Sequence, residues 1–132
     1  MGRVGVGSTG TVELSSLDGS DGFVINGIDA GDESGGSVSG AGDINGDGVA
    51  DLIIGANRAD PNGNDDAGES YVVFGGVLTG STGTVELSSL DGSDGFVING
   101  IDGSDLSGIS VSGAGDINAD GVADLILSLI HI

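Results

Sequence analysis

The sequence predicts an all-β fold, and three features of the 132-residue chain indicate it. Glycine accounts for 29 residues and proline for only one, so turns must be frequent and regular helix is disfavoured. Apolar residues come in runs of three or four, such as residues 72–74 and 96–98, bounded by Gly, Asp, Asn and Ser. Runs of this kind are typical of short strands. The third feature is a long internal repeat.

Residues 7–29 reappear without change as residues 80–102, and similarity continues through 51–53 and 124–126. A repeat of this length, with about four strand-like runs, suits one β-propeller blade of four-stranded antiparallel sheet. Alternation of apolar and polar residues within the runs is weak, which fits sheets packed on both faces. A β-solenoid also buries both faces, but its repeats are usually much shorter. We therefore predict a β-propeller fragment of about two blades.

The repeat also predicts how the chain is divided. Residues 1–29 are assigned to the outer strands of a preceding blade, residues 30–102 to one complete blade, and residues 103–126 to the truncated start of the next. Within the complete blade and its flanks, strands are expected near residues 37–41, 52–56, 70–74, 84–87 and 96–101. An isolated pair of blades would leave sheet edges unpaired, so the remaining blades of a parent propeller are expected partners.

The last six residues, 127–132, depart abruptly from the repeat. They read Leu-Ser-Leu-Ile-His-Ile, which is what CTG-TCT-CTT-ATA-CAC-ATC encodes, the mosaic-end adapter of transposase-based sequencing libraries. We expect this tail to be non-native and its His131 to carry no function. The alternative is a genuine apolar strand at the C-terminus, and the codons of the coding DNA would distinguish the two.

Two loops of the form Asp-x-Asn-x-Asp-Gly-x-x-Asp carry the main chemical signal. Their alternate residues offer oxygen donors, and position seven offers a backbone carbonyl, so each loop can surround one hard cation. The predicted ligands are Asp43, Asn45, Asp47, Val49 and Asp51 in the first loop and Asp116, Asn118, Asp120, Val122 and Asp124 in the second. Each loop leads into an apolar run, so both are expected to be calcium-binding hairpin loops.

The donor set favours Ca²⁺ over other metals. Mg²⁺ demands stricter octahedral geometry, and Zn²⁺ would need the nitrogen or sulfur ligands that both loops lack. An EF-hand needs a glutamate at position twelve and a helix on each side of the loop, but Ile54 and Leu127 stand at that position and the flanking residues resemble strands. The alternative is an acidic, glycine-rich turn without metal. The shorter acidic turns at 17–22 and 90–95, and the loop carboxylates of residues 60, 65 and 66, are expected to be structural or solvated.

The charge balance excludes several partners. The chain has 21 acidic and two basic residues, a formal net charge of −19, so nucleic acid and anionic membrane surfaces would repel it. Dense carboxylates favour bound cations, although acidity also keeps a secreted protein soluble. No stretch approaches the roughly 20 apolar residues of a membrane span, so no direct membrane insertion is expected. The first residues show no apolar signal sequence, so any export signal is expected outside this chain.

The motifs resemble FG-GAP repeats. The resemblance rests on Gly-Ala-Gly-Asp-Ile-Asn-Gly-Asp-Gly at 40–48, Asp-Leu-Ile-Ile-Gly-Ala at 51–56 and Gly-Glu-Ser-Tyr-Val-Val-Phe-Gly at 68–75. FG-GAP repeats are the blades of integrin α-subunit propellers and of many large bacterial surface or secreted proteins. Two elements depart from the family pattern: Asn57 replaces the usual proline, and Gly35-Gly36 and Gly108-Ile109 replace the Phe-Gly pair. Neither departure touches a proposed ligand.

The resemblance implies a seven-bladed propeller in which calcium pins a hairpin within each blade. It also implies an extracellular or cell-surface parent protein with a role in adhesion or recognition of an unknown protein or carbohydrate. The alternatives are the non-catalytic propeller of a secreted enzyme, such as a polysaccharide lyase or lipid hydrolase, and a calcium-dependent lectin. The chain itself is not expected to be an enzyme, because it has no lysine or cysteine and its well-placed carboxylates are assigned to calcium.

Overall fold

A computed structural model describes residues 10–78 and 83–130. Within these ranges the chain is all-β, with short 3-10 helices and no α-helix, which confirms the predicted fold class. The strands are β1 Val24–Asn26, β2 Ser37–Gly42, β3 Asp51–Ala56, β4 Glu69–Val73, β5 Thr84–Glu86, β6 Gly95–Asn99, β7 Ser110–Gly115 and β8 Asp124–Ser128. The 3-10 helices are η1 Leu14–Ser16, η2 Ala30–Asp32, η3 Pro61–Gly63, η4 Gly75–Leu78 and η5 Leu87–Ser89.

Some parts of the sequence-based division lie outside the described residues. These are residues 1–9 of the segment assigned to a preceding blade, residues 79–82 within the assigned complete blade, and residues 131–132 of the adapter-like tail. The first part of that tail does form structure, because Leu127 and Ser128 belong to β8.

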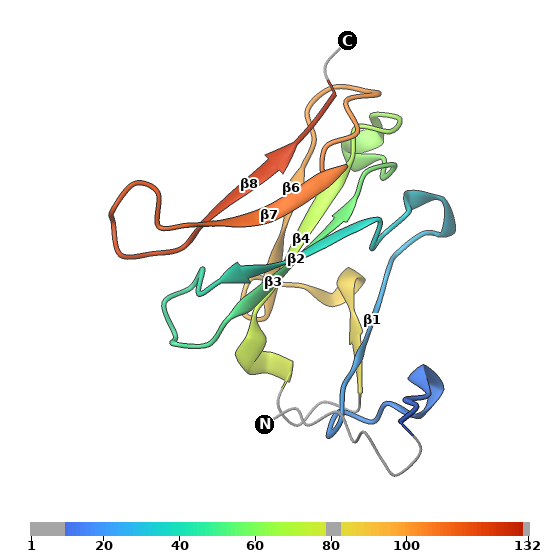
Figure 1. The fold of residues 1–132 in the computed structure, drawn as a ribbon. Helices are drawn as coiled ribbons and strands as arrows, with labels where there is room; N and C mark the ends of the chain where they lie inside the picture. The colour runs from blue at the N-terminus through green and yellow to red at the C-terminus, as the bar shows by residue number, and fades with distance from the viewer. Residues whose placement is uncertain (1–9, 79–82, 131–132) are drawn as a thin grey trace.

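The largest sheet has four antiparallel strands in the order β2-β3-β4-β6 (Figure 1). In this sheet, strands that are consecutive in the sequence pair with each other, with one exception. β4 pairs with β6 and not with β5. Antiparallel pairing of this kind is typical of a propeller blade, whereas the coils of a solenoid pair in parallel. Four of the five expected strands are thus found in one sheet, and their bounds shift by at most two residues.

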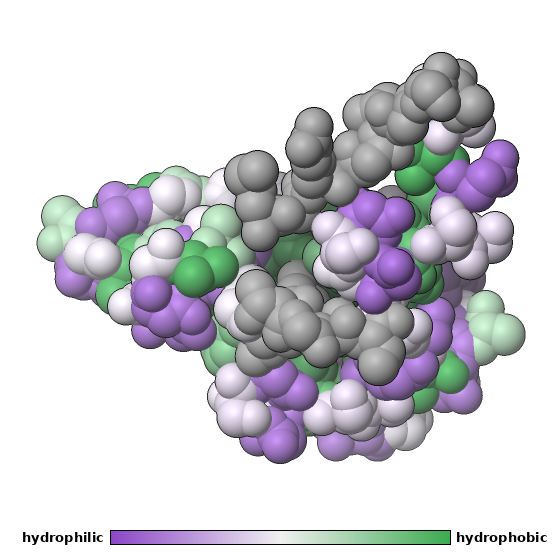
Figure 2. Space-filling view, turned by 90° about the horizontal axis from the view of Figure 1, so that it is seen from below, coloured by the Kyte–Doolittle hydropathy of each residue, from purple (hydrophilic) through white to green (hydrophobic). Residues whose placement is uncertain are grey.

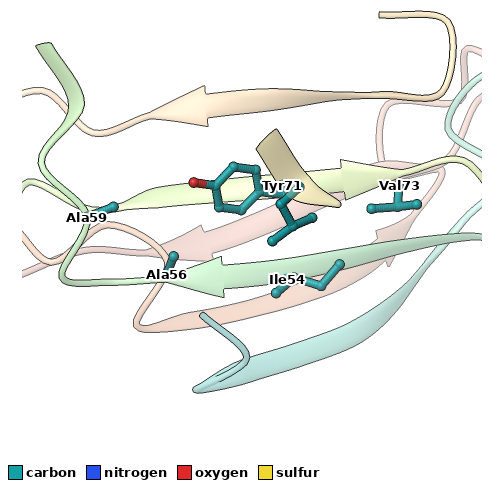
Figure 3. Close-up of a cluster of buried hydrophobic side chains, with 6 residues drawn as sticks. Ile54, Ala56, Ala59, Tyr71 and Val73 are labelled. Atoms are coloured by element: carbon teal, nitrogen blue, oxygen red, sulfur yellow. The ribbon is translucent and has the colours of Figure 1, made fainter. Parts of the chain in front are cut away.

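Both faces of this sheet are buried. Because side chains alternate along a strand, Ile54, Tyr71 and Val73 face one way, and Ile53 and Val72 face the other. The first set forms a cluster with Ala56, Ala59 and Leu87 (Figure 3). The second set packs with Ala41, Phe74 and Val111, where the β7-β8 sheet covers the opposite face. Burial on two faces explains why the sequence runs show so little alternation.

The remaining two sheets differ in kind. β7 and β8 form an antiparallel pair whose register repeats that of β2 and β3, including a bulge between the last two pairs. β1 and β5 form a short parallel pair, which the sequence did not predict. Identical segments therefore have different partners: Val24 lies opposite Thr84, whereas its copy Val97 lies opposite Tyr71.

Close contact between the four-stranded sheet and the segment that leads into β7 depends on glycine. A Cβ atom on Gly55 would overlap the backbone carbonyl of Gly108, and a Cβ on Gly68 would overlap the backbone of Ser107. The backbone of one layer thus lies directly against the backbone of the next.

Replacing Gly55 by alanine is expected to lower the free energy of unfolding by about 1–3 kcal/mol or more, because backbone must move to admit the methyl group. Gly40→Ala is the matched control, since Gly40 is also a strand glycine and its Cβ would meet nothing within 4 Å. Denaturant unfolding of both variants measures the difference. Equal destabilisation would show that the two layers do not approach as closely as described.

Candidate metal centre

Two loops project from the same side of the molecule. The first joins β2 to β3 and the second joins β7 to β8; both extend to the left in Figure 1. In Figure 2 they form the lobe at the left, where hydrophilic and hydrophobic side chains are mixed on the surface. The backbone N–H of Ala123 donates to the carbonyl oxygen of Asp43 at 3.4 Å, so the loops are in direct contact.

The first loop is organised around the carboxylate of Asp43. Its two oxygens accept hydrogen bonds from the backbone N–H groups of Asp47, at 3.0 Å, and Gly48, at 2.8 Å. Asn45 Oδ1 accepts a second, longer bond from the same Asp47 N–H at 3.3 Å, and Asn45 Nδ2 donates to Asp47 Oδ2 at 3.2 Å. Asp47 Oδ1 accepts from the N–H of Val49 at 2.8 Å. The predicted donors at positions one, three and five therefore lie side by side.

The second loop repeats this network. Asp116 accepts from the N–H groups of Asp120 and Gly121 at 3.0 and 2.9 Å, and Asp120 accepts from that of Val122 at 2.8 Å. Asn118 Oδ1 accepts from the N–H of Asp120 at 3.1 Å. Because the two loops have different surroundings, the shared network is set by the loop sequence and not by packing.

The last aspartate of each loop closes the hairpin. Asp51 Oδ2 accepts from the N–H of Ile44 at 2.7 Å, and Asp124 Oδ2 accepts from that of Ile117 at 2.8 Å. Asp51 makes a further bond, from the N–H of Gly75 to Oδ1 at 3.0 Å, and is only 1% exposed. This side chain thus connects the loop to the end of β4, a role that the ligand spacing alone did not reveal.

The donor chemistry of the loops fits a hard cation, since only oxygen atoms are offered. The carboxylates are not preassembled, however. Among residues 10–78 and 83–130, no three His, Cys, Asp or Glu side chains converge closely enough to hold a metal ion. The carboxylates of Asp51 and Asp124 accept hydrogen bonds from backbone N–H groups. To bind a cation as well, each carboxylate must either contact the ion and the N–H group together or rotate away from the N–H group. The amide of Asn45 or Asn118 and the carbonyl of Val49 or Val122 complete the set.

Backbone conformation within the loops is also matched. Gly46 and its counterpart Ala119 both have positive φ angles, 75° and 61°. Glycine adopts this conformation freely, whereas alanine does so at some cost. The second loop therefore keeps its shape despite an unfavourable residue.

A group of carboxylates outside the loops was missed by sequence reasoning. Ile28, Asp29, Asp32, Ala59, Asp60 and Glu69 line a cavity of about 160 Å³. Burial, followed by the nearby charges of Asp29 and Asp60, raises the pKa of Asp32. The Tyr71 hydroxyl donates to Glu69, and burial followed by this bond raises the pKa of the phenol. These residues come from separate segments, so no local motif could have marked them.

The other acidic turns are structural, as expected. Asp18 Oδ1 accepts from both the N–H and the hydroxyl of Ser20, and Asp91 accepts in the same way from Ser93. The side-chain bond to the serine is the main cause that lowers the pKa of each aspartate. The Asp66 side chain is 41% exposed and lies 3.6 Å from Arg58, which also pairs with Glu33 at 3.2 Å.

Residues 34–73 match the family model of the FG-GAP repeat. This range includes β2, the first loop, β3 and β4, which are the elements that carry the sequence resemblance. The chain contains an FG-GAP repeat. The antiparallel all-β architecture is consistent with a fragment of the β-propeller that such repeats build. Asp43, Asn45, Asp47, Val49 and Asp51 all lie within the matched repeat.

Two further findings concern the chain as a whole and its described part. No curated protein matches its sequence. Over the two described ranges, no helix has the length and apolar character required to cross a membrane.

Proposed function

We propose that this chain is a calcium-binding segment of a β-propeller, in which each Asp-x-Asn-x-Asp-Gly-x-x-Asp loop holds one structural Ca²⁺. The observation that supports this most directly is the duplicated network. Two loops in different surroundings keep the same oxygen donors and the same hydrogen bonds from backbone N–H groups within the loop, even where alanine replaces glycine. In both loops these donors are oxygen atoms alone, which is the chemistry that Ca²⁺ prefers.

A cation would relieve a real electrostatic cost. Asp43 and Asp47 are close to each other and to Asn45, and Asp116 and Asp120 are likewise close to each other in the second loop. Two like charges about 4 Å apart repel by about 1 kcal/mol in water and about 4 kcal/mol at an effective dielectric constant of 20. The chain carries a net charge of −19, so few internal cations are available to offset this repulsion.

We further propose an extracellular or cell-surface parent protein that uses the assembled propeller for adhesion or recognition of a protein or carbohydrate. Every loop position from Asn45 to Ala50 is exposed. Solvent-exposed sites that need rearrangement bind weakly, and extracellular calcium modules have dissociation constants of about 10⁻⁴–10⁻³ M. The proposed role is non-catalytic, because the loop carboxylates are already assigned to the hairpins and the cation.

Calcium is expected to raise the melting temperature of the chain by on the order of 10 °C when it is present at about 100 times the dissociation constant. Such binding stabilises the folded state by about 2.7 kcal/mol per site. The measurement is thermal unfolding of metal-free protein titrated with CaCl₂, with MgCl₂ at equal ionic strength as control. Equal responses to the two salts would rule out calcium selectivity, and no response to either would rule out structural sites.

A further inference from the structure

Four Asn-Gly pairs occur in the chain: Asn26-Gly27, Asn45-Gly46, Asn62-Gly63 and Asn99-Gly100. In such a pair the backbone nitrogen of glycine can attack the side-chain amide carbon of asparagine, because no Cβ shields it. The reaction needs an exposed side chain, a nitrogen not held in a hydrogen bond, and backbone that can move. The structure separates the four pairs on these grounds.

Three of the pairs are restrained. Gly63 N donates to the Asp60 carbonyl at 3.2 Å, and Gly100 N donates to the Gly68 carbonyl at 2.7 Å. Gly100 is also packed tightly against the backbone of Ala67. In the first pair, Asn26 lies in β1 and its Nδ2 donates to Glu86 Oε1 at 2.9 Å.

The pair in the first loop lies outside any strand, and it lacks the backbone hydrogen bonds that hold Gly63 and Gly100. Asn45 and Gly46 are both exposed, and a Cβ on Gly46 would meet nothing within 4 Å. Among the described residues, Gly46 N donates no hydrogen bond. The N–H of Asp47 donates to Asn45 Oδ1 at 3.3 Å and so polarises the amide carbonyl. The Asp47 carboxylate lies 3.2 Å from Nδ2, the nitrogen that must leave.

We propose that Asn45 is a site of spontaneous deamidation. Gly46 N forms a bond to the Asn45 side-chain carbon while the bond from that carbon to Nδ2 breaks. The proton lost by Gly46 N leaves on ammonia, and a five-membered cyclic imide remains. One water molecule then opens the imide at either carbonyl, which leaves an aspartate or an isoaspartate at position 45. No oxidant, reductant or enzyme is required.

The modification would change the loop that we assign to calcium, and this consequence alone rests on the proposed function. The aspartate product adds one negative charge at ligand position three. The isoaspartate product adds a carbon to the backbone between Asp43 and Asp47, which breaks the spacing of the donors. One asparagine thus gives two products with opposite effects on cation binding.

The second loop provides a matched internal control. Asn118 is exposed, and its Oδ1 accepts from the N–H of Asp120 at 3.1 Å, as in the first loop. The following residue is Ala119, whose methyl group shields the nitrogen. A difference in rate between Asn45 and Asn118 therefore reports on Gly46 and not on the loop geometry.

The test is to incubate metal-free protein in mildly alkaline buffer and to follow each asparagine by peptide mass spectrometry. Deamidation appears as a mass gain of one unit, and separation of the isoaspartate peptide from the aspartate peptide distinguishes the two products. Digestion at acidic residues suits a chain with no lysine and two arginines. It also distinguishes the loops, because Asp-Ile-Asn-Gly at 43–46 and Asp-Ile-Asn-Ala at 116–119 differ in mass. We expect Asn45 to react several-fold faster than Asn62 and Asn118.

Two variants make the outcome decisive. Gly46→Ala should slow Asn45 to the rate of Asn118, and Ala119→Gly should accelerate Asn118 to the rate of Asn45. An Asn45 that reacts no faster than Asn118, or a rate unchanged by Gly46→Ala, would overturn the proposal. A parallel incubation with CaCl₂ addresses the separate question of ligation. Deamidation that calcium does not slow would contradict Asn45 as a ligand and leave the modification site established.

Discussion

Asp51→Ala is expected to lower the free energy of unfolding by roughly 2–5 kcal/mol, the largest stability change anticipated for a single loop residue. The carboxylate of Asp51 is buried and accepts from the backbone N–H groups of Ile44 and Gly75. Alanine would leave both donors without their partner around a buried position, and each unsatisfied buried donor costs about 1–3 kcal/mol. Because small domains are stabilised by only about 5–15 kcal/mol, much of the fold would be lost.

Asp124→Ala is the matched control for this prediction. Asp124 occupies the same loop position and bonds to Ile117, but it is partly exposed, so water can replace the bond. Its replacement should cost clearly less. Urea unfolding followed by circular dichroism would compare the two variants in the absence of metal. Equal losses would show that the bond to Gly75 contributes nothing.

Replacing Asp43 and Asp47 together by alanine is expected to reduce the calcium stoichiometry from two ions to one. Both side chains are proposed ligands of the first loop, and the donors of the second loop, Asp116 and Asp120, are left in place. Isothermal titration calorimetry on the full chain measures the stoichiometry directly. The reciprocal double variant of Asp116 and Asp120 should also retain one site.

A control for charge alone is available in the short turn at Asp91. Asp91→Ala removes a carboxylate that bonds only within its own turn, so it should leave both calcium sites intact. If the Asp43 and Asp47 variant still bound two ions, the assigned ligands would be wrong. If Asp91→Ala lost a site, binding would depend on overall charge and not on the loops.

The sequence predicted those features that are encoded locally. Apolar runs located β3 and β4, whose strands are buried on both faces, and the spacing of donors located the two loops. The loop hydrogen bonds repeat in both copies, so they too follow from nearby residues. Prediction succeeded where neighbouring residues determine the conformation.

Long-range pairing could not be predicted in the same way. The segments at 22–26 and 95–99 are identical, yet one pairs with β5 and the other with β4. Their environments, and not their sequences, select the partner. The cavity beside Asp32 and the contact between Asp51 and Gly75 likewise join residues that are distant along the chain.

The hydrogen bond between Ala123 and Asp43 has a mechanical consequence. Ala123 stands between Val122 and Asp124, two proposed calcium ligands of the second loop. Asp43 is itself a proposed ligand of the first loop. A force that pulls one loop away from the sheets is therefore passed to the other loop through main-chain atoms, and among substitutions at position 123 only proline would remove the N–H that donates. The two projecting loops therefore resist a pulling force as one connected unit, although they belong to different sheets.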